Sequence, residues 1–108
     1  MMVKVEPRKL GEDTVLSIEV KLPKTNLLVF STQTGYVMCG ALDIGLLRTK
    51  LRERGVIAAR AVGVRTMDDL WNGTIESCTQ AAEAIGIHAG MAVQDALTKM
   101  IEAERVRS

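Results

Sequence analysis

Apolar and polar side chains alternate along the first third of the chain, a pattern that predicts β-strands. Across residues 14–22, four aliphatic side chains alternate with polar ones, as in a strand with one face in water. The aliphatic positions are Leu16, Ile18, Val20 and Leu22. The run MVKVE at 2–6 alternates in the same way, and Gly11-Glu12-Asp13 predicts a turn between these two strands.

Two further strands are predicted before the pattern changes. LLVFS at 27–31 is apolar on both faces, and TQTG at 32–35 connects it as a hairpin to YVMC at 36–39. From residue 41 to residue 54 the spacing becomes helical, with basic residues in the last turns and Gly55 as the C-terminal stop. The β-branched run at 56–64 then predicts a strand, so that strand, helix and strand form a right-handed crossover between parallel strands.

The last third of the chain is predicted to be helical. Thr66 can cap a short helix that ends at Gly73, and Thr74 can cap a second helix that ends at Gly86. A final amphipathic helix covers 93–101, and ERVRS at the end is expected to fray. The predicted order is β-β-β-β-α-β-α-α-α, which gives an α+β fold: a two-layer sandwich of one mixed sheet with helices on one face.

Length and composition limit the classes of protein that fit. A chain of 108 residues is the size of one domain, here 1–108, and 47% apolar residues are enough for a core. A formal charge of +1 and three aromatic residues give no support for nucleic-acid binding. The charged start MMVKVEPRKL lacks the apolar stretch of a signal peptide, and no run is long enough to span a membrane. We therefore expect a cytoplasmic protein.

The residue types that bind metals and cofactors are sparse. Cys39 and Cys78 are the two cysteines and His88 is the single histidine, so a structural zinc site is not expected. The glycines match neither a dinucleotide-binding nor a phosphate-loop fingerprint. The sequence predicts no cofactor.

Three segments together resemble the YunC-like family of small bacterial and archaeal proteins. They are GYVMCGALD at 35–43, ARAVGVRT at 59–66 and the DDLWNG helix at 68–73, with VKLPKTNLL before them. The resemblance runs from about Leu16 to Met100 and implies a compact two-layer α/β fold. It implies no activity, because the function of that family is unknown. His88 and Cys78 lie outside the shared motifs, and Trp71 stands where an aliphatic residue is more usual, so we expect Trp71 to serve packing.

Cys39 allows two interpretations. It lies at the end of the fourth predicted strand, just before the predicted helix 41–54, and N–H groups at a helix N-terminus favour a thiolate. A catalytic or redox role for Cys39 would follow from that. Free cysteine is also among the most buried residue types, and no histidine base accompanies it, so a small core side chain is the other interpretation.

The predicted sheet edge brings a second set of polar residues near Cys39. The carboxyl ends of parallel strands face the same edge, where ligands of open α/β sheets bind. Gly40, Asp43, Arg60, Arg65 and Thr66 are therefore the candidate ligand-binding residues, and a carboxylate or phosphate is the ligand that fits them. Surface ion pairs of these arginines with nearby aspartates are the alternative, and Asp43 is the expected partner of Arg60.

These observations leave three functional hypotheses of different classes. The sequence favours a small binding module for an anionic metabolite at the turns around residues 39–43 and 63–68. The alternatives are an enzyme that uses the thiol of Cys39 as a nucleophile or redox group, and a structural or interaction protein that self-associates. Helices on one face leave the other face of the sheet open, so we also expect a second copy to cover it in a symmetric homodimer. No nucleic acid and no membrane is expected among the partners.

Overall fold

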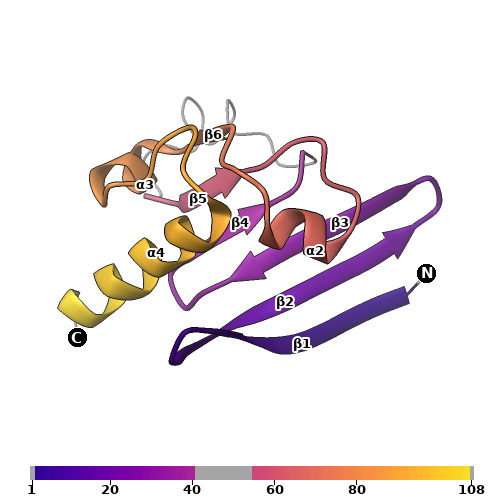
Figure 1. Ribbon diagram of the computed structural model, residues 1–108, viewed down its shortest axis with the longest axis horizontal. Coiled ribbons are helices and arrows are strands. Elements are labelled where there is room, and N and C mark those ends of the chain that lie inside the picture. The colour runs from indigo at the N-terminus through magenta and orange to yellow at the C-terminus, as the bar shows by residue number, and fades with distance from the viewer. Residues whose placement is uncertain (1, 41–54, 108) are drawn as a thin grey trace.

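Six strands form one mixed sheet in the computed structural model, which describes residues 2–40 and 55–107 (Figure 1). The strands are β1 (Met2–Leu10), β2 (Asp13–Leu22), β3 (Thr25–Ser31), β4 (Gly35–Met38), β5 (Ile57–Arg60) and β6 (Ser77–Cys78). The described helices are α2 (Met67–Trp71), α3 (Gln80–Ala84) and α4 (Val93–Arg107). The predicted helix 41–54 lies outside the described residues. The α+β fold with one mixed sheet is confirmed.

The strands follow one another across the sheet in the order of the sequence. All neighbours pair antiparallel except β4 and β5, which are parallel, as the crossover predicted. Turns at Gly11 (φ 63°) and Lys24 (φ 64°) adopt left-handed backbone conformations at the two long hairpins. Strands β1 and β2 are longer than β4, β5 and β6, so the sheet extends well beyond the helices at its N-terminal edge (Figure 1).

Three predicted boundaries were wrong. The strand at 56–64 is regular only over Ile57–Arg60. The predicted helix capped by Thr74 does not form there, because Thr74 makes an isolated bridge to Ala92 and the chain then pairs with β5 as β6. The helix α3 begins later, at the cap residue Thr79. The last helix does not fray at ERVRS but continues through Arg107.

One buried threonine explains where α3 begins. The side chain of Thr79 is nearly inaccessible, with 3% of the residue exposed. Its Oγ1 donates to the Val56 carbonyl at 2.6 Å and accepts from the N–H groups of Ala58 and Ala82, at 3.2 Å and 3.3 Å. One hydroxyl thus caps α3 and fixes it to the start of β5.

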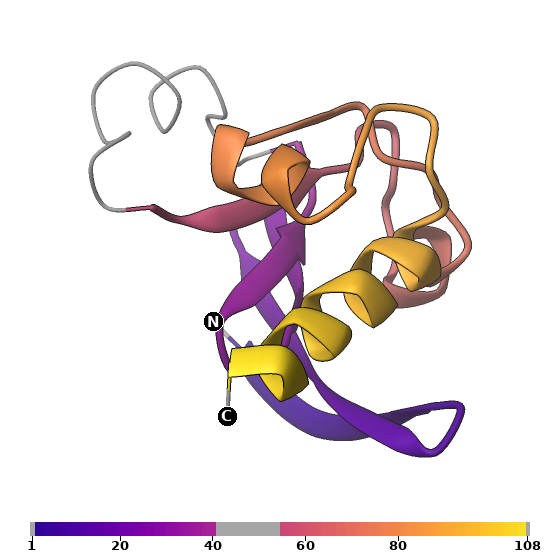
Figure 2. The ribbon, with the colours of Figure 1, turned by 90° about the vertical axis from the view of Figure 1, so that its left-hand side faces the viewer.

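The hydrophobic core lies on one face of the sheet. Strands β2 to β5 present Val15, Leu28, Phe30, Val37 and Ala59 to this face, and α2, α3 and α4 cover it. The helices contribute buried residues to the same cluster: Leu70, Ala82, Val93, Ala96, Leu97 and Met100. Figure 2 shows α2 and α4 on the same side of the sheet.

The opposite face of the sheet, which we call the outer face, carries the aliphatic residues of the alternating pattern. The register aligns Val5 with Ile18 and Ile18 with Val29, so these side chains share one face across β1, β2 and β3. The polar positions Ser17 and Glu19 lie on the helix-covered face, where they line a hollow together with Met67 and Asp68 of α2. The pattern correctly predicted a strand with one polar and one aliphatic face. The polar residues, however, lie on the side of the helices.

None of the helices within residues 2–40 and 55–107 has the length and apolar character needed to cross a bilayer.

Candidate functional site

The ends of β4 and β5 meet at one sheet edge, as the sequence predicted. The Ala61 N–H donates to the Met38 carbonyl at 3.0 Å, which continues the parallel pairing past both strands. A methyl group on Gly40 would lie 3.6 Å from Val62 Cγ1, so the two segments that leave the strands are neighbours. Gly40 and Val62 are both exposed there. Asp43, which was predicted to join this site, lies outside the described residues.

Cys39 belongs to the core. The residue is 5% exposed and forms part of the hydrophobic cluster under the helices. Its backbone N–H donates to the Leu28 carbonyl at 3.0 Å, and its Sγ lies 3.7 Å from the Asn26 carbonyl oxygen. This environment favours the interpretation of Cys39 as a small packed side chain over that of an exposed nucleophile.

Arg60 pairs across the sheet with Glu76. Its Nη2 lies 2.8 Å and 3.0 Å from the two carboxylate oxygens of Glu76. The hydrogen bonds from Arg60 hold the pKa of Glu76 below its ordinary value of 4.5. The partner identified by the structure is thus Glu76, next to β6, and the expected Asp43 contact falls on undescribed residues. An anion at Arg60 would compete with this carboxylate.

Arg65 and the cap residue Thr66 precede α2, and the Arg65 backbone N–H and the Thr66 hydroxyl are both used within the turn. The Thr66 Oγ1 accepts from the Asp69 N–H at 3.0 Å, and the Arg65 N–H donates to the Asp69 carboxylate at 3.1 Å. The carboxylate of Asp69 therefore occupies the position that an anion would take at this helix start. Helix α2 has five residues, which limits its dipole.

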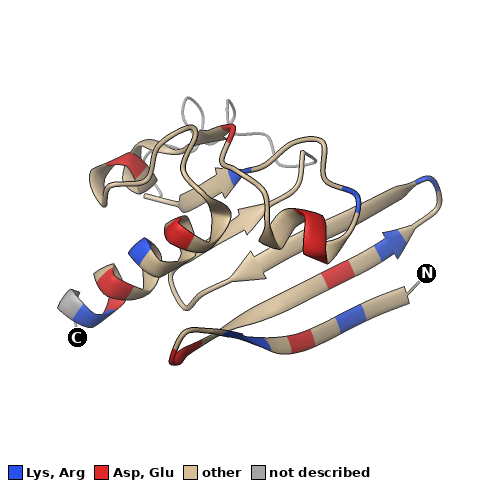
Figure 3. Cartoon of the chain, viewed as in Figure 1, with Lys and Arg blue, Asp and Glu red and all other residues tan. Residues whose placement is uncertain are grey.

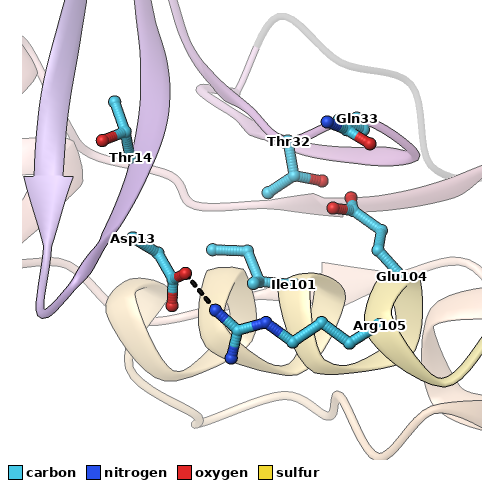
Figure 4. A pocket seen from close by; sticks show the side chains of 7 residues that line it. All are labelled: Asp13, Thr14, Thr32, Gln33, Ile101, Glu104 and Arg105. Carbon is cyan, nitrogen blue, oxygen red and sulfur yellow. Dashed lines mark hydrogen bonds and ion pairs between the residues drawn. The ribbon is translucent and has the colours of Figure 1, made fainter. Parts of the chain in front are cut away.

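A cavity of about 300 Å³ lies elsewhere, between the β1–β2 hairpin, the β3–β4 turn and α4 (Figure 4). The Arg105 guanidinium is paired with Asp13 across this cavity. The Glu104 carboxylate accepts from the N–H and the hydroxyl of Thr34, each at 2.9 Å. Burial raises the pKa of Glu104, but hydrogen bonds from the β3–β4 turn outweigh it and keep the pKa below the ordinary 4.5.

No pattern in the sequence indicates this cavity. Glu104 and Thr34 are 70 residues apart, and Arg105 and Asp13 are 92 apart. Both acidic side chains already have partners, and within the described residues no three metal-ligating side chains gather in one place. These contacts fasten the end of α4 to the sheet.

Arg8 forms a second connection that the sequence did not reveal. Its guanidinium lies 4.3 Å from the centre of the Trp71 ring and 5.9 Å from that of Phe30. Its Nη1 is also 3.1 Å from the Asp68 carboxylate. The expectation that Trp71 serves packing fits its contact with Phe30, with ring centres 5.0 Å apart. Arg8 thus fixes α2 to the edge strand β1. Figure 3 shows the charged positions that alternate along β1.

Known proteins resemble this chain over most of its length. Residues 38–100 match the model of a domain of unknown function, DUF1805. The chain is 48% identical over 101 residues to the uncharacterized protein YunC of Bacillus subtilis (strain 168), covering 94% of this chain and 100% of that protein. Its fold is similar to the crystal structure of a protein of unknown function, TA1206, from Thermoplasma acidophilum. That match has a TM-score of 0.80 and 26% identity, and covers 91% of this chain and 92% of the other. The matched family model and the identity to YunC show that this chain belongs to the DUF1805, YunC-like family.

Proposed function

We propose that the chain is a self-associating module whose outer face packs against a second copy of itself. The single observation that carries the proposal is the exposure of aliphatic side chains on that face. Val3 is 58% exposed, Val5 53%, Leu16 42% and Leu22 36%. The register places these four residues on the same face of the sheet as the partly buried Ile18. A contiguous apolar patch of this kind is typical of an interaction surface.

The size of the outer face is in the range that a dimer core needs. Three strands about 4.8 Å apart and about eight residues long span a flat area of roughly 400 Å² before side-chain relief is counted. A standard interface buries about 800 Å² of accessible surface on each partner, including its polar rim. The face therefore supplies the apolar centre of such an interface, and the polar residues around it supply the rim.

The edge of the sheet is less suited to pairing than its face. Strand β1 is the edge, and Pro7 removes one N–H donor from it. Lys4 and Glu6, joined by an ion pair of 3.3 Å, add charge along the same strand. These features blunt an edge against strand addition. The proposed contact is accordingly face to face, about a two-fold axis.

The test is the mass of the protein in solution at tens of micromolar, measured by light scattering. We expect a dimer for the unmodified chain and a monomer for the double variant Val5→Gln with Leu16→Gln, which changes the outer face only. The matched control is Glu6→Gln with Lys21→Gln, which changes exposed positions on the opposite face of the same strands and should remain dimeric. A monomer for the unmodified chain, or equal masses for both double variants, would refute the proposal.

A second candidate function is the binding of a small anionic ligand at the meeting point of β4 and β5. It is favoured by the proximity of Gly40 and Val62, which leaves exposed backbone at the carboxyl ends of two parallel strands. Arg65 and Thr66 would approach from the start of α2, and Asp43 completes the predicted set. Inorganic phosphate should then raise the melting temperature of the unmodified chain, and less so that of Arg65→Gln. The control Lys21→Gln should respond like the unmodified chain, and an equal response of all three excludes this site.

A further inference from the structure

Asn72 and Gly73 form a sequence that is prone to deamidation. The Gly73 nitrogen attacks the side-chain Cγ of Asn72, a nitrogen–carbon bond forms and ammonia leaves, giving a cyclic imide. Water then opens the imide to aspartate or isoaspartate. Glycine leaves the attacking nitrogen unhindered, and Asn72 is exposed at the C-terminal cap of α2. The other asparagine of the chain, Asn26, precedes the bulky Leu27.

The folded cap holds the reacting atoms apart. The ψ angle of Asn72 is 7°, which turns the Gly73 nitrogen away from the Asn72 side chain. The Gly73 N–H donates to the Leu70 carbonyl at 3.2 Å, and the Asn72 Nδ2 donates to the Asp68 carbonyl at 3.0 Å. Both hydrogen bonds must break before the nitrogen can reach Cγ, so the reaction requires the turn to open.

Side chains from two other elements hold this turn closed. The Arg8 guanidinium of β1 lies 4.3 Å from the centre of the Trp71 ring, and its Nη1 lies 3.1 Å from the Asp68 carboxylate. Arg8 thus contacts α2 at two residues. Gln94 of α4 donates from Nε2 to the Trp71 carbonyl at 3.1 Å. A helix of five residues has few hydrogen bonds of its own, so these contacts, together with the burial of Leu70, keep it from opening locally.

We propose that Asn72 is a deamidation site whose rate is set by the opening of α2, and that Arg8 controls that opening. The product weakens the structure further. A carboxylate at position 72 has no N–H to donate to the Asp68 carbonyl, and its negative charge lies close to that carbonyl oxygen, at the C-terminal cap of a helix that already carries Asp68 and Asp69. The modification therefore reduces the stability of the α2–β1 contact, and it is irreversible in the isolated protein.

The test follows the conversion of the Asn72 peptide by mass spectrometry during incubation of the full chain at mildly alkaline pH. We expect slow conversion in the folded chain, several-fold faster conversion in Arg8→Ala, and the fastest in urea. Gln94→Met should accelerate the conversion as well, and it tests the control of α2 opening even if Arg8→Ala folds poorly. The control Lys9→Ala removes a cation of β1 that points to the outer face, and it should leave the rate unchanged.

Two results would overturn the proposal. Equal rates in the folded chain and in urea would show that the cap does not protect Asn72. An unchanged rate in both Arg8→Ala and Gln94→Met would show that these side chains do not control the opening. The Asn26 peptide, measured in the same samples, should remain unmodified over the same period.

Discussion

Replacement of Thr79 by valine should lower the stability of the protein more than its small change in shape suggests. Valine keeps the size of the side chain and removes the hydroxyl, which now serves three backbone groups. The carbonyl of Val56 and the N–H groups of Ala58 and Ala82 would lose a partner at a position that is 3% exposed. An unsatisfied buried polar group costs about 1–3 kcal/mol and a lost helix cap about 1 kcal/mol.

These contributions are not additive, because water can reach part of the opened site, so we expect a loss of about 2–4 kcal/mol in the free energy of unfolding. The measurement is urea unfolding at a fixed protein concentration, with the slope used to check that the same surface is exposed. Thr79→Ser keeps the hydroxyl and removes one methyl group, so it should cost only about 1 kcal/mol. If Thr79→Val loses no more than Thr79→Ser, the hydroxyl does not hold β5 and α3 together and the reasoning is wrong.

Three further outcomes are expected. Gly35→Ala should cost about 1–3 kcal/mol in urea unfolding, because its methyl would lie 2.8 Å from the Ile57 carbonyl; a neutral substitution would contradict this close approach. In a Cys78→Ser background, Cys39 should react with iodoacetamide only as fast as the protein opens, and rapid labelling of the folded chain would return it to the candidate nucleophiles. The pKa of Glu104 is lowered on folding, so its contribution to stability is present above about 4.5 and is lost as the pH falls; Glu104→Gln should weaken this acid sensitivity, and an unchanged pH profile would contradict it.

The local pattern of apolar and polar residues was sufficient to predict the strands in the first third of the chain. A period of two residues and turn-forming residues between the runs are local properties, and β1 to β4 follow them closely. The parallel pairing of β4 and β5 could also be predicted, because the order strand, helix, strand is compatible with only a few topologies. The segments that leave these two strands are neighbours at Gly40 and Val62, and the ligand site predicted at this edge stays a prediction.

Long-range pairing accounts for what the sequence did not predict. Thr74 and Thr79 are equivalent as helix caps by local rules, and the pairing of residues 77–78 with β5 decides between them. The sequence pointed to Asp43, at the start of the adjoining predicted helix, as the partner of Arg60, and Asp43 lies outside the described residues. Within the described residues Arg60 pairs with Glu76, because β6 lies beside β5 and places that carboxylate within hydrogen-bonding distance.

The alternating pattern also could not reveal which face of the sheet the helices cover. Strand β2 supplies Val15 to the core, and then presents Ser17 and Glu19 on that same face and aliphatic residues on the other. For an isolated domain the reverse order would be more favourable, with polar residues outward and aliphatic residues under the helices. Of the residues that β2 turns toward the helices, Val15 is buried in the core, whereas Ser17 and Glu19 line a hollow beside the start of α2. The aliphatic row of β1 and β2 is left on the outer face. Aliphatic side chains at these positions add stability only where another surface removes them from water. A second copy of the same face offers a surface of matching size and character.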